Sequence, residues 1–172
     1  MSKVFRYDWK VKHHLFGDPQ RKTQNVSLMD CWKSFFGEEH LSNEDGWSCE
    51  RCPEGASATK QFRMTTEPSL LIIHLKRFKK TTTRTFKCNN PVMIPLKLVF
   101  SAQYNLIGIA RHHGVSVASG HYTAEVADSE GKGWWRCDDR SVYKAGRECD
   151  RESRDAYILF YEKTQAWGFH KW

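Results

Sequence analysis

The sequence contains no apolar run long enough to cross a bilayer. Its longest apolar stretch, Leu70 to Leu75, is interrupted by His74, whereas a membrane-spanning helix needs about 20 consecutive apolar residues. A signal-like apolar stretch is also missing. The six cysteines are therefore expected to be reduced thiols of a cytoplasmic or nuclear protein. We expect no membrane partner.

Acidic residues are fewer than basic ones. The chain has 20 Asp and Glu against 27 Lys and Arg, which gives a net charge of +7. Such an excess invites a nucleic-acid-binding interpretation. The basic residues are spread along the chain, however, and no helix-turn-helix, zinc-finger repeat or RNA-recognition signature organises them. A basic nucleic-acid-binding module therefore stays a less favoured alternative, and nucleic acid is not an expected partner.

The chain nevertheless has the composition of a folded protein. Its 172 residues are 40% hydrophobic and 13% aromatic, which indicates one domain, or most of one. Ser27 is a good N-cap, Gly37 is a suitable stop, and apolar residues between them recur at helical spacing. These residues are Leu28, Cys31, Trp32, Phe35 and Phe36. The pattern predicts a helix near residues 28–36.

Strand-like segments make up much of the remainder. They cover residues 5–11, 60–64, 70–75, 95–98, 104–109, 122–127, 134–137 and 156–161. The polar segment at 81–85 is expected to be a hairpin tip or loop. Together these patterns predict an α+β fold, dominated by an antiparallel sheet, with one confident helix.

One predicted hairpin brings a histidine to a carboxylate. His121 begins the strand at 122–127, and Asp138 follows the strand at 134–137 after a turn at Gly131-Lys132-Gly133. The start of the first strand therefore lies near the end of the second. Such a pair holds an imidazole in one tautomer and makes it a better base. The alternative interpretation is a structural histidine that closes the hairpin.

Several segments in one order resemble the ubiquitin-specific proteases, which are papain-like deubiquitinases. They are Leu71–Phe78, Tyr104–Gly114, Gly120-His121-Tyr122, Trp134…Asp138-Asp139-x-x-Val142 and Ala156–Tyr161. The resemblance runs from about Ser27 to Tyr161 and implies the palm and part of the fingers of that fold. We divide the chain into residues 1–26, without an assignment, 27–163, the C-terminal part of a protease domain, and a tail at 164–172.

The resemblance implies roles for particular residues. His121 matches the catalytic base and Asp138 the orienting carboxylate, with Asp139 as second choice. His112 is a rival for the base, but it matches a family position that shapes the site. His112, Gly114, Gly120 and Tyr122 would line the groove for ubiquitin's glycine-ended tail. Expected partners are ubiquitin or a ubiquitinated protein.

Cys49-x-x-Cys52 has the spacing of half a zinc site. The family often carries a second cysteine pair upstream, yet residues 1–26 contain no cysteine. No cofactor is therefore expected, and zinc at Cys49 and Cys52 is the alternative. The simpler interpretation is a turn whose metal has been lost or whose partner ligands lie outside this chain.

The family's nucleophile is missing from the sequence. It lies in an Asn-x-Gly-Asn-x-Cys box at the start of a helix, whose positive end lowers the thiol pKa. None of the six cysteines has that context. One interpretation is a fragment, an incomplete gene product or a chain completed by a separate polypeptide carrying the Cys box. Another is a catalytically dead ubiquitin-binding module. In either case, the isolated chain is expected to be inactive.

Overall fold

The computed structural model describes residues 3–7, 26–42, 48–52, 56–80, 85–116 and 118–164. In these ranges the chain forms one helix, α1 (Leu28–Phe36), and short to long strands. The strands are β1 (Lys3–Tyr7), β2 (Val26–Ser27), β3 (Glu39–Leu41), β4 (Ala58–Lys60), β5 (Leu70–Leu75), β6 (Phe78–Lys80), β7 (Thr85–Lys87), β8 (Val92–Met93), β9 (Lys97–Val99), β10 (Gln103–His113), β11 (His121–Ala127), β12 (Trp134–Asp138), β13 (Ser141–Gly146), β14 (Glu152–Ser153) and β15 (Ala156–Lys163). The predicted α+β class is confirmed.

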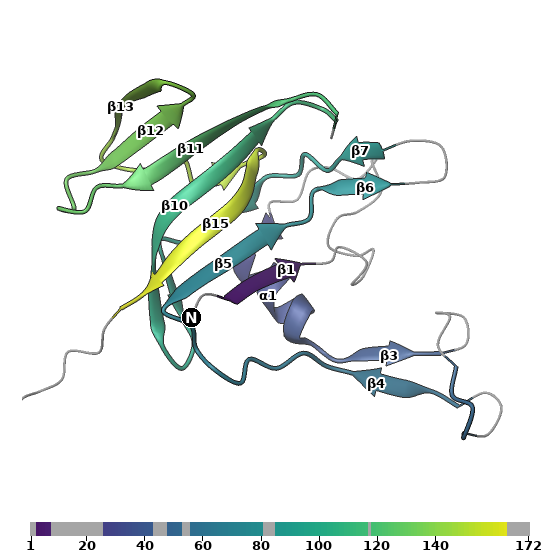
Figure 1. Ribbon diagram of the computed structural model, residues 1–172. Helices are drawn as coiled ribbons and strands as arrows, with labels where there is room; N and C mark the ends of the chain where they lie inside the picture. Colours follow the sequence, from purple (N-terminus) through teal and green to yellow (C-terminus); the bar gives the residue numbers. More distant parts are fainter. Residues whose placement is uncertain are drawn as a thin grey trace, which may run out of the picture.

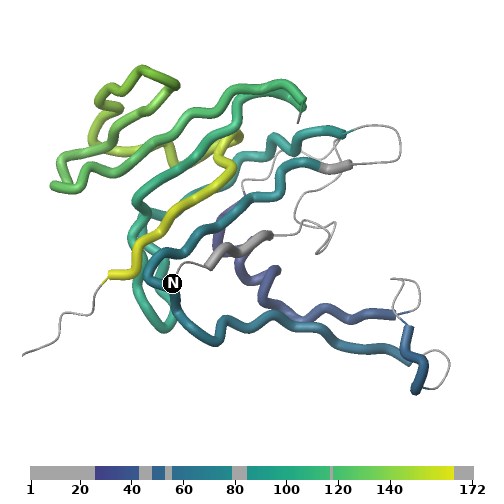
Figure 2. Tube along the Cα trace, in the orientation of Figure 1, coloured from purple at the N-terminus to yellow at the C-terminus, as the bar shows by residue number. Residues whose placement is uncertain are grey.

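The main sheet has the order β1-β5-β15-β10-β11-β12-β13, and β9 also pairs with β10. Its pairings are antiparallel except for that of β1 with β5. Figure 1 shows the sheet running from β13 at the upper left to β1 near the centre. The β3–β4 hairpin projects away from it at the lower right (Figure 2). Among the described residues, no helix has the length and apolar character needed to cross a membrane.

Helix α1 begins and ends where the sequence predicts. Ser27 is the N-cap, because its Oγ accepts a hydrogen bond from the Asp30 N–H at 3.0 Å. Such a cap stabilises a helix by about 1 kcal/mol. Gly37 is the C-cap. Leu28 and Cys31 are buried, so the predicted apolar face packs inward.

The core lies between the helix and the centre of the sheet. Its fully buried side chains come mainly from β5, β10 and β15 and include Leu71, Tyr104, Ile109, Leu159 and Tyr161. Arg77, two residues after the end of β5, is also buried. Its guanidinium donates to four backbone carbonyls, those of Ala156, Ser153, Cys88 and Asn90, at 2.6–3.0 Å. This satisfied cation ties β5 to the segment that enters β15.

One strand expectation is wrong. The segment from residue 60 was expected to be a strand through Met64, but β4 ends at Lys60 and residues 61–65 have no regular structure. Phe62 stacks on Phe35 of α1, with ring centroids 5.0 Å apart. An aromatic contact with the helix, and not ladder pairing, therefore holds this segment.

Other expectations are met only in part. β1 lies within the strand expected near residues 5–11, whereas residues 8–25 lie outside the described residues. The loop expected at 81–85 joins the paired strands β6 and β7, and its residues 81–84 also lie outside them. The tail at 164–172 is described only at Thr164. The domain boundaries stay predictions.

Candidate active site

The site is built on three neighbouring strands. In β10 and β11, His113 lies opposite His121; in β11 and β12, Glu125 lies opposite Arg136 and Ala124 opposite Cys137. Side chains alternate between the faces of a sheet. His121 and Asp138 therefore share one face with Glu125 and Arg136, whereas Tyr122 and Cys137 belong to the other.

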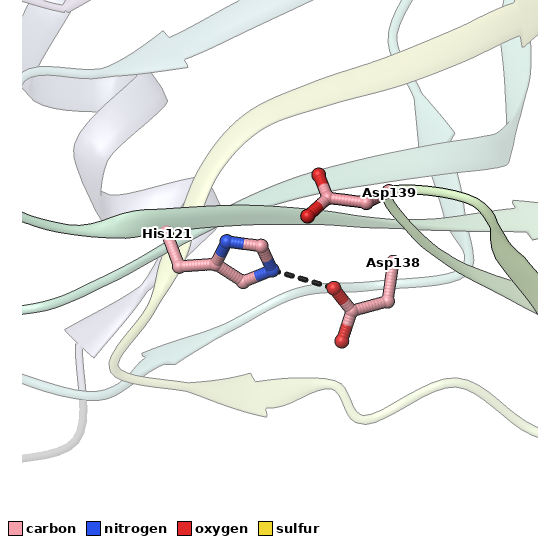
Figure 3. Close-up of side chains that lie close together, drawn as sticks. All are labelled: His121, Asp138 and Asp139. Atoms are coloured by element: carbon pink, nitrogen blue, oxygen red, sulfur yellow. Dashed lines mark hydrogen bonds and ion pairs between the residues drawn. The ribbon is translucent and has the colours of Figure 1, made fainter.

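The structure brings His121 and Asp138 together, as the hairpin predicts. His121 Nε2 lies 2.5 Å from Asp138 Oδ1 (Figure 3). The two side chains are 47% and 43% exposed, so the contact lies at the open end of the hairpin and is accessible from solvent. Their catalytic roles stay predictions.

The contact with Asp138 sets both the pKa and the orientation of the His121 imidazole. The hydrogen bond to Asp138 raises the pKa of His121 above 6.5, against an opposing effect of partial burial, and Asp139 adds to the rise. Within the described part of the chain, no hydrogen bond occupies Nδ1. The ring is therefore oriented through Nε2 and can exchange a proton through Nδ1.

Asp139 lies beside this pair without bonding to the ring (Figure 3). Its φ of 48° is in the left-handed region, which Asp tolerates better than most residues. One donor atom from each of His121, Asp138 and Asp139 lies within 4.8 Å of the others, the spacing of a possible metal site. The direct bond from His121 to Asp138 is sufficient to explain the arrangement without an ion.

His112 lies in a different environment. It is 2% exposed and contacts the rings of Tyr122 and Phe78, with centroids 4.9 Å and 5.1 Å away. Burial, and next the nearby Lys87, lower the pKa of His112. Because it belongs to the face opposite His121, it does not compete as the base in this structure. Its predicted part in tail binding is untested.

Gly114 and Gly120 close the connection between β10 and β11. Gly114 has a φ of +126°, and a Cβ there would lie 2.7 Å from the Ser119 carbonyl oxygen. A Cβ at Gly120 would collide with the imidazole of His112 and the carbonyl of His113. The chain's own packing therefore requires both glycines, independently of the predicted tail groove. Tyr122, the remaining predicted groove residue, is 57% exposed.

None of the described cysteines joins the site. Burial raises the pKa of Cys31 to about 12 and that of Cys149 to about 11. Cys88 donates to Asn90 Oδ1 at 3.3 Å, and Cys137 belongs to the face away from His121. These four thiols show no environment that would activate a nucleophile.

Cys49 and Cys52 form a disulfide across a turn in which the Cys52 N–H donates to the Cys49 carbonyl, so the expectation that all six cysteines are reduced thiols is wrong for this pair. Zinc would require both as free thiolates. No other cysteine, histidine or carboxylate forms a metal-binding group with them in the described ranges. Binding of zinc here stays untested.

Sequence reasoning missed the buried charges near the site. Lys87, Arg111 and Glu125 are 7%, 3% and 1% exposed. The available signal was their spacing: Arg111 precedes His113 by two residues, and Glu125 follows His121 by four. In strands, such spacings place the side chains on one face.

Comparisons with known proteins identify a family and several relatives that are similar to this chain. Residues 17–161 match the family described as ubiquitin carboxyl-terminal hydrolase. Ubiquitin carboxyl-terminal hydrolase 15 from Homo sapiens is 32% identical over 168 residues, and Ubiquitin carboxyl-terminal hydrolase 4 from Bos taurus is 31% identical over 174. These matches cover 91% and 93% of this chain but only 17% and 18% of the relatives. The chain thus spans less than a fifth of their length.

Solved structures of the yeast SAGA DUB module are similar in fold. One matches with a TM-score of 0.72 and 29% identity, over 82% of this chain and 33% of that chain. A Ubp8/Sgf11/Sus1/Sgf73 DUB module bound to ubiquitin aldehyde gives a TM-score of 0.68 and 28% identity, over 82% and 34%. Together with the family match, this fold shows that the chain belongs to the ubiquitin carboxyl-terminal hydrolase family.

Proposed function

We propose that this chain supplies the general base and its orienting carboxylate to a cysteine-type hydrolase that cleaves the isopeptide bond after ubiquitin's C-terminal glycine. The observation that carries the proposal is the 2.5 Å contact between His121 Nε2 and Asp138 Oδ1, in a chain whose family is shown. The nucleophilic thiol comes from outside the described residues, from a polypeptide segment that carries the family's Cys box.

His121 has a defined task in this reaction. Its Nδ1 accepts the proton of the thiol, and the thiolate attacks the carbonyl carbon of the terminal glycine. The imidazolium then returns that proton to the departing lysine amine as the C–N bond breaks and a thioester forms. Water, deprotonated by the same ring, hydrolyses the thioester. Asp138 stabilises the imidazolium through Nε2–H, which is consistent with the raised pKa of His121.

Ubiquitin's tail would pass beside the connection between β10 and β11. Gly114 and Gly120 present backbone without side chains, and exposed Tyr122 offers a ring next to them. His112 supports this wall from beneath, because it contacts Tyr122. The similar DUB module bound to ubiquitin aldehyde supports ubiquitin as the partner.

The binding part of the proposal can be tested with the chain alone. A ¹⁵N-labelled sample should show amide shifts near Gly120 and Tyr122 when ubiquitin is added. Ubiquitin that lacks its two terminal glycines is the matched control and should leave those amides unchanged. Equal shifts with both proteins would exclude tail recognition at this wall.

The catalytic part needs a source of the thiol. An electrophilic ubiquitin probe should leave the isolated chain unlabelled, but it should label a fusion of this chain to the Cys-box segment of a family member. A ubiquitin-binding module without activity is the second candidate, since no described cysteine lies beside His121. A fusion that folds and binds ubiquitin yet never turns over substrate would favour that second function.

A further inference from the structure

Three charged residues from neighbouring strands form one network on the face that carries His121 and Asp138. Arg111 of β10 donates from Nη2 to Glu125 Oε2 of β11 at 2.8 Å. Arg136 of β12 donates from Nη2 to Glu125 Oε1. The side chains of Arg111 and Glu125 are 4% and 2% exposed. We call Arg111, Glu125 and Arg136 the charged triad.

Stability alone does not explain such a network. Burial opposes ionisation of Glu125, but hydrogen bonds from Arg136 and Arg111 outweigh it, so the pKa of Glu125 is lowered and its carboxylate is charged. Apolar side chains of similar volume often stabilise a fold as well as a buried ionic group does. What an ionic network adds is selectivity, because a buried charge that loses its partner is costly, and these three charges are paired in the register seen here.

The register that pairs the three charges of the triad is also the one that brings His121 to Asp138. Glu125 lies directly opposite Arg136, and the ladder continues to Ala124 opposite Cys137. One further step in this register sets residue 123 opposite Asp138. His121 then reaches Asp138 as a diagonal neighbour. A shift of one residue would turn Asp138 to the other face of the sheet.

The triad also anchors the hairpin to the rest of the fold. Arg111 Nη1 donates to Ser153 Oγ at 2.6 Å, and Nη2 donates to the Asp150 carbonyl at 2.8 Å. Both partners lie just before β15, which is central in the sheet. The opposite end of the hairpin is closed by its turn, where the Asp128 N–H donates to the Gly133 carbonyl. The pair of Glu125 and Arg136 lies in the middle of the β11–β12 ladder, so the triad fixes the pairing between this turn and His121.

We propose that Arg111, Glu125 and Arg136 are positioning residues that set His121 against Asp138 by fixing the register of β11 and β12. They do not touch the reacting atoms and act only through the hairpin. The catalytic consequence rests on the proposed function, whereas the contact that they control is a property of the chain itself.

The sharpest test removes the three charges of the triad but keeps side chains of similar volume. In the triple variant Arg111→Met, Glu125→Leu, Arg136→Met, the fold should persist, with amide exchange in β5 and β15 unchanged. Amides of β11 and β12 should exchange about tenfold faster or more. The NMR-measured pKa of His121 should fall from its raised value towards 6.5.

Two further variants make the result decisive. Arg136→Met leaves the pair of Arg111 and Glu125 intact, and since Arg136 is 39% exposed, this variant should fold and show the same changes in smaller degree. It decides the question if the triple variant does not fold. Lys163→Met, which breaks the distant 2.9 Å pair with Glu67, is the matched control and should leave His121 unchanged.

A folded triad variant with wild-type His121 titration and wild-type exchange in β11 and β12 would overturn the proposal. So would a uniform loss of protection across the whole sheet, because that would indicate a general structural role. Failure of the proposed function has a separate signature. The triad variants would still alter His121, while His121→Ala would leave turnover of the fusion intact.

Discussion

The two faces of the sheet formed by β10 to β13 differ in which charged and apolar side chains they bury. One face carries His121, Asp138 and the charged triad, with Arg111 3% and Glu125 1% exposed. The other carries Tyr122, Val126, Trp135 and Val142, which are 57%, 44%, 38% and 62% exposed. Ordinary sheets bury the apolar face and expose the polar one. Here the charged triad is buried on the same face as the core residue Trp134, so the interior of this sheet holds charges that set geometry beside apolar packing.

The largest loss of activity should come from substitutions on the face that carries His121 and Asp138. In the fusion with a Cys-box segment, His121→Ala should lower the turnover rate by about 10²–10⁴-fold, the usual contribution of a general base. Asp138→Asn should cost less, because an amide oxygen still accepts from Nε2–H but carries no charge. Steady-state cleavage of a ubiquitin-linked fluorophore measures both. His40→Ala, at the exposed position of β3, is the control. Turnover that survives His121→Ala would show that the base assignment is wrong.

Two adjacent tryptophans on opposite faces of β12 should contribute very different amounts to the stability of the fold. Trp134 is 6% exposed and belongs to the core, so Trp134→Ala should lower the free energy of unfolding by about 3–5 kcal/mol. Trp135 is 38% exposed and donates from Nε1 to Asp128 at 3.0 Å. Trp135→Ala should cost only about 1 kcal/mol. Urea unfolding with unchanged slope would measure both; equal losses would contradict the assignment of the two side chains to different environments.

The pKa values of two histidines on opposite faces of the sheet should be shifted in opposite directions from 6.5. The pKa of His121 is raised, chiefly by its hydrogen bond to Asp138, and that of His112 is lowered, chiefly by burial. The Asp138 contact therefore stabilises the fold fully below pH 6.5 and loses this contribution as the pH rises through the folded pKa of His121. His112 has the reverse effect: its contribution is present above pH 6.5 and is lost as the pH falls towards its folded pKa.

Ring-proton NMR between pH 4 and 9, about the range in which imidazoles titrate, measures both pKa values. Asp138→Asn should move the His121 midpoint down and leave that of His112 in place. A His121 midpoint at or below 6.5 in the unmodified chain would contradict the Asp138 contact in solution.

The smallest change in stability should come from substitutions on the exposed apolar face, which carries Val142. Val142 is 62% exposed, so Val142→Thr should change the free energy of unfolding by less than about 0.5 kcal/mol. Val92 is 1% exposed, and the same change there should cost about 1–3 kcal/mol, because a hydroxyl is buried. Thermal unfolding of the two variants provides a matched pair. A large loss from Val142→Thr would mean that another part of the chain covers this face in solution.

The sequence predicts the parts of this fold that local chemistry determines. Ser27 and Gly37 mark both ends of α1 because capping is a local property. The run from Leu70 to Leu75 coincides with β5. The contact of His121 with Asp138 follows from a short turn and strand alternation alone, which require no knowledge of the remaining chain.

Long-range pairing was harder to predict. β13 (Ser141–Gly146) was not expected, although its valine and tyrosine were a signal, because its six residues are all exposed and no burial pattern marks them. The triad was missed since a charged residue in a strand usually faces water, and only the three-strand register shows that Arg111, Glu125 and Arg136 meet. Local pattern predicts a strand at Phe62, and the contact that decides otherwise is with Phe35, 27 positions away in the sequence.

The connection between β10 and β11 has consequences for protein engineering. Its end points, Gly114 and Gly120, have no space for even a methyl group, whereas each doubling of a loop's length adds only about 0.6 kcal/mol of closure entropy. A fluorophore-bearing peptide inserted between those two positions should therefore be tolerated if both anchors are kept. It would place an optical reporter within a few residues of the imidazole, so that arrival of a ubiquitin tail could be followed in real time without any chemistry taking place.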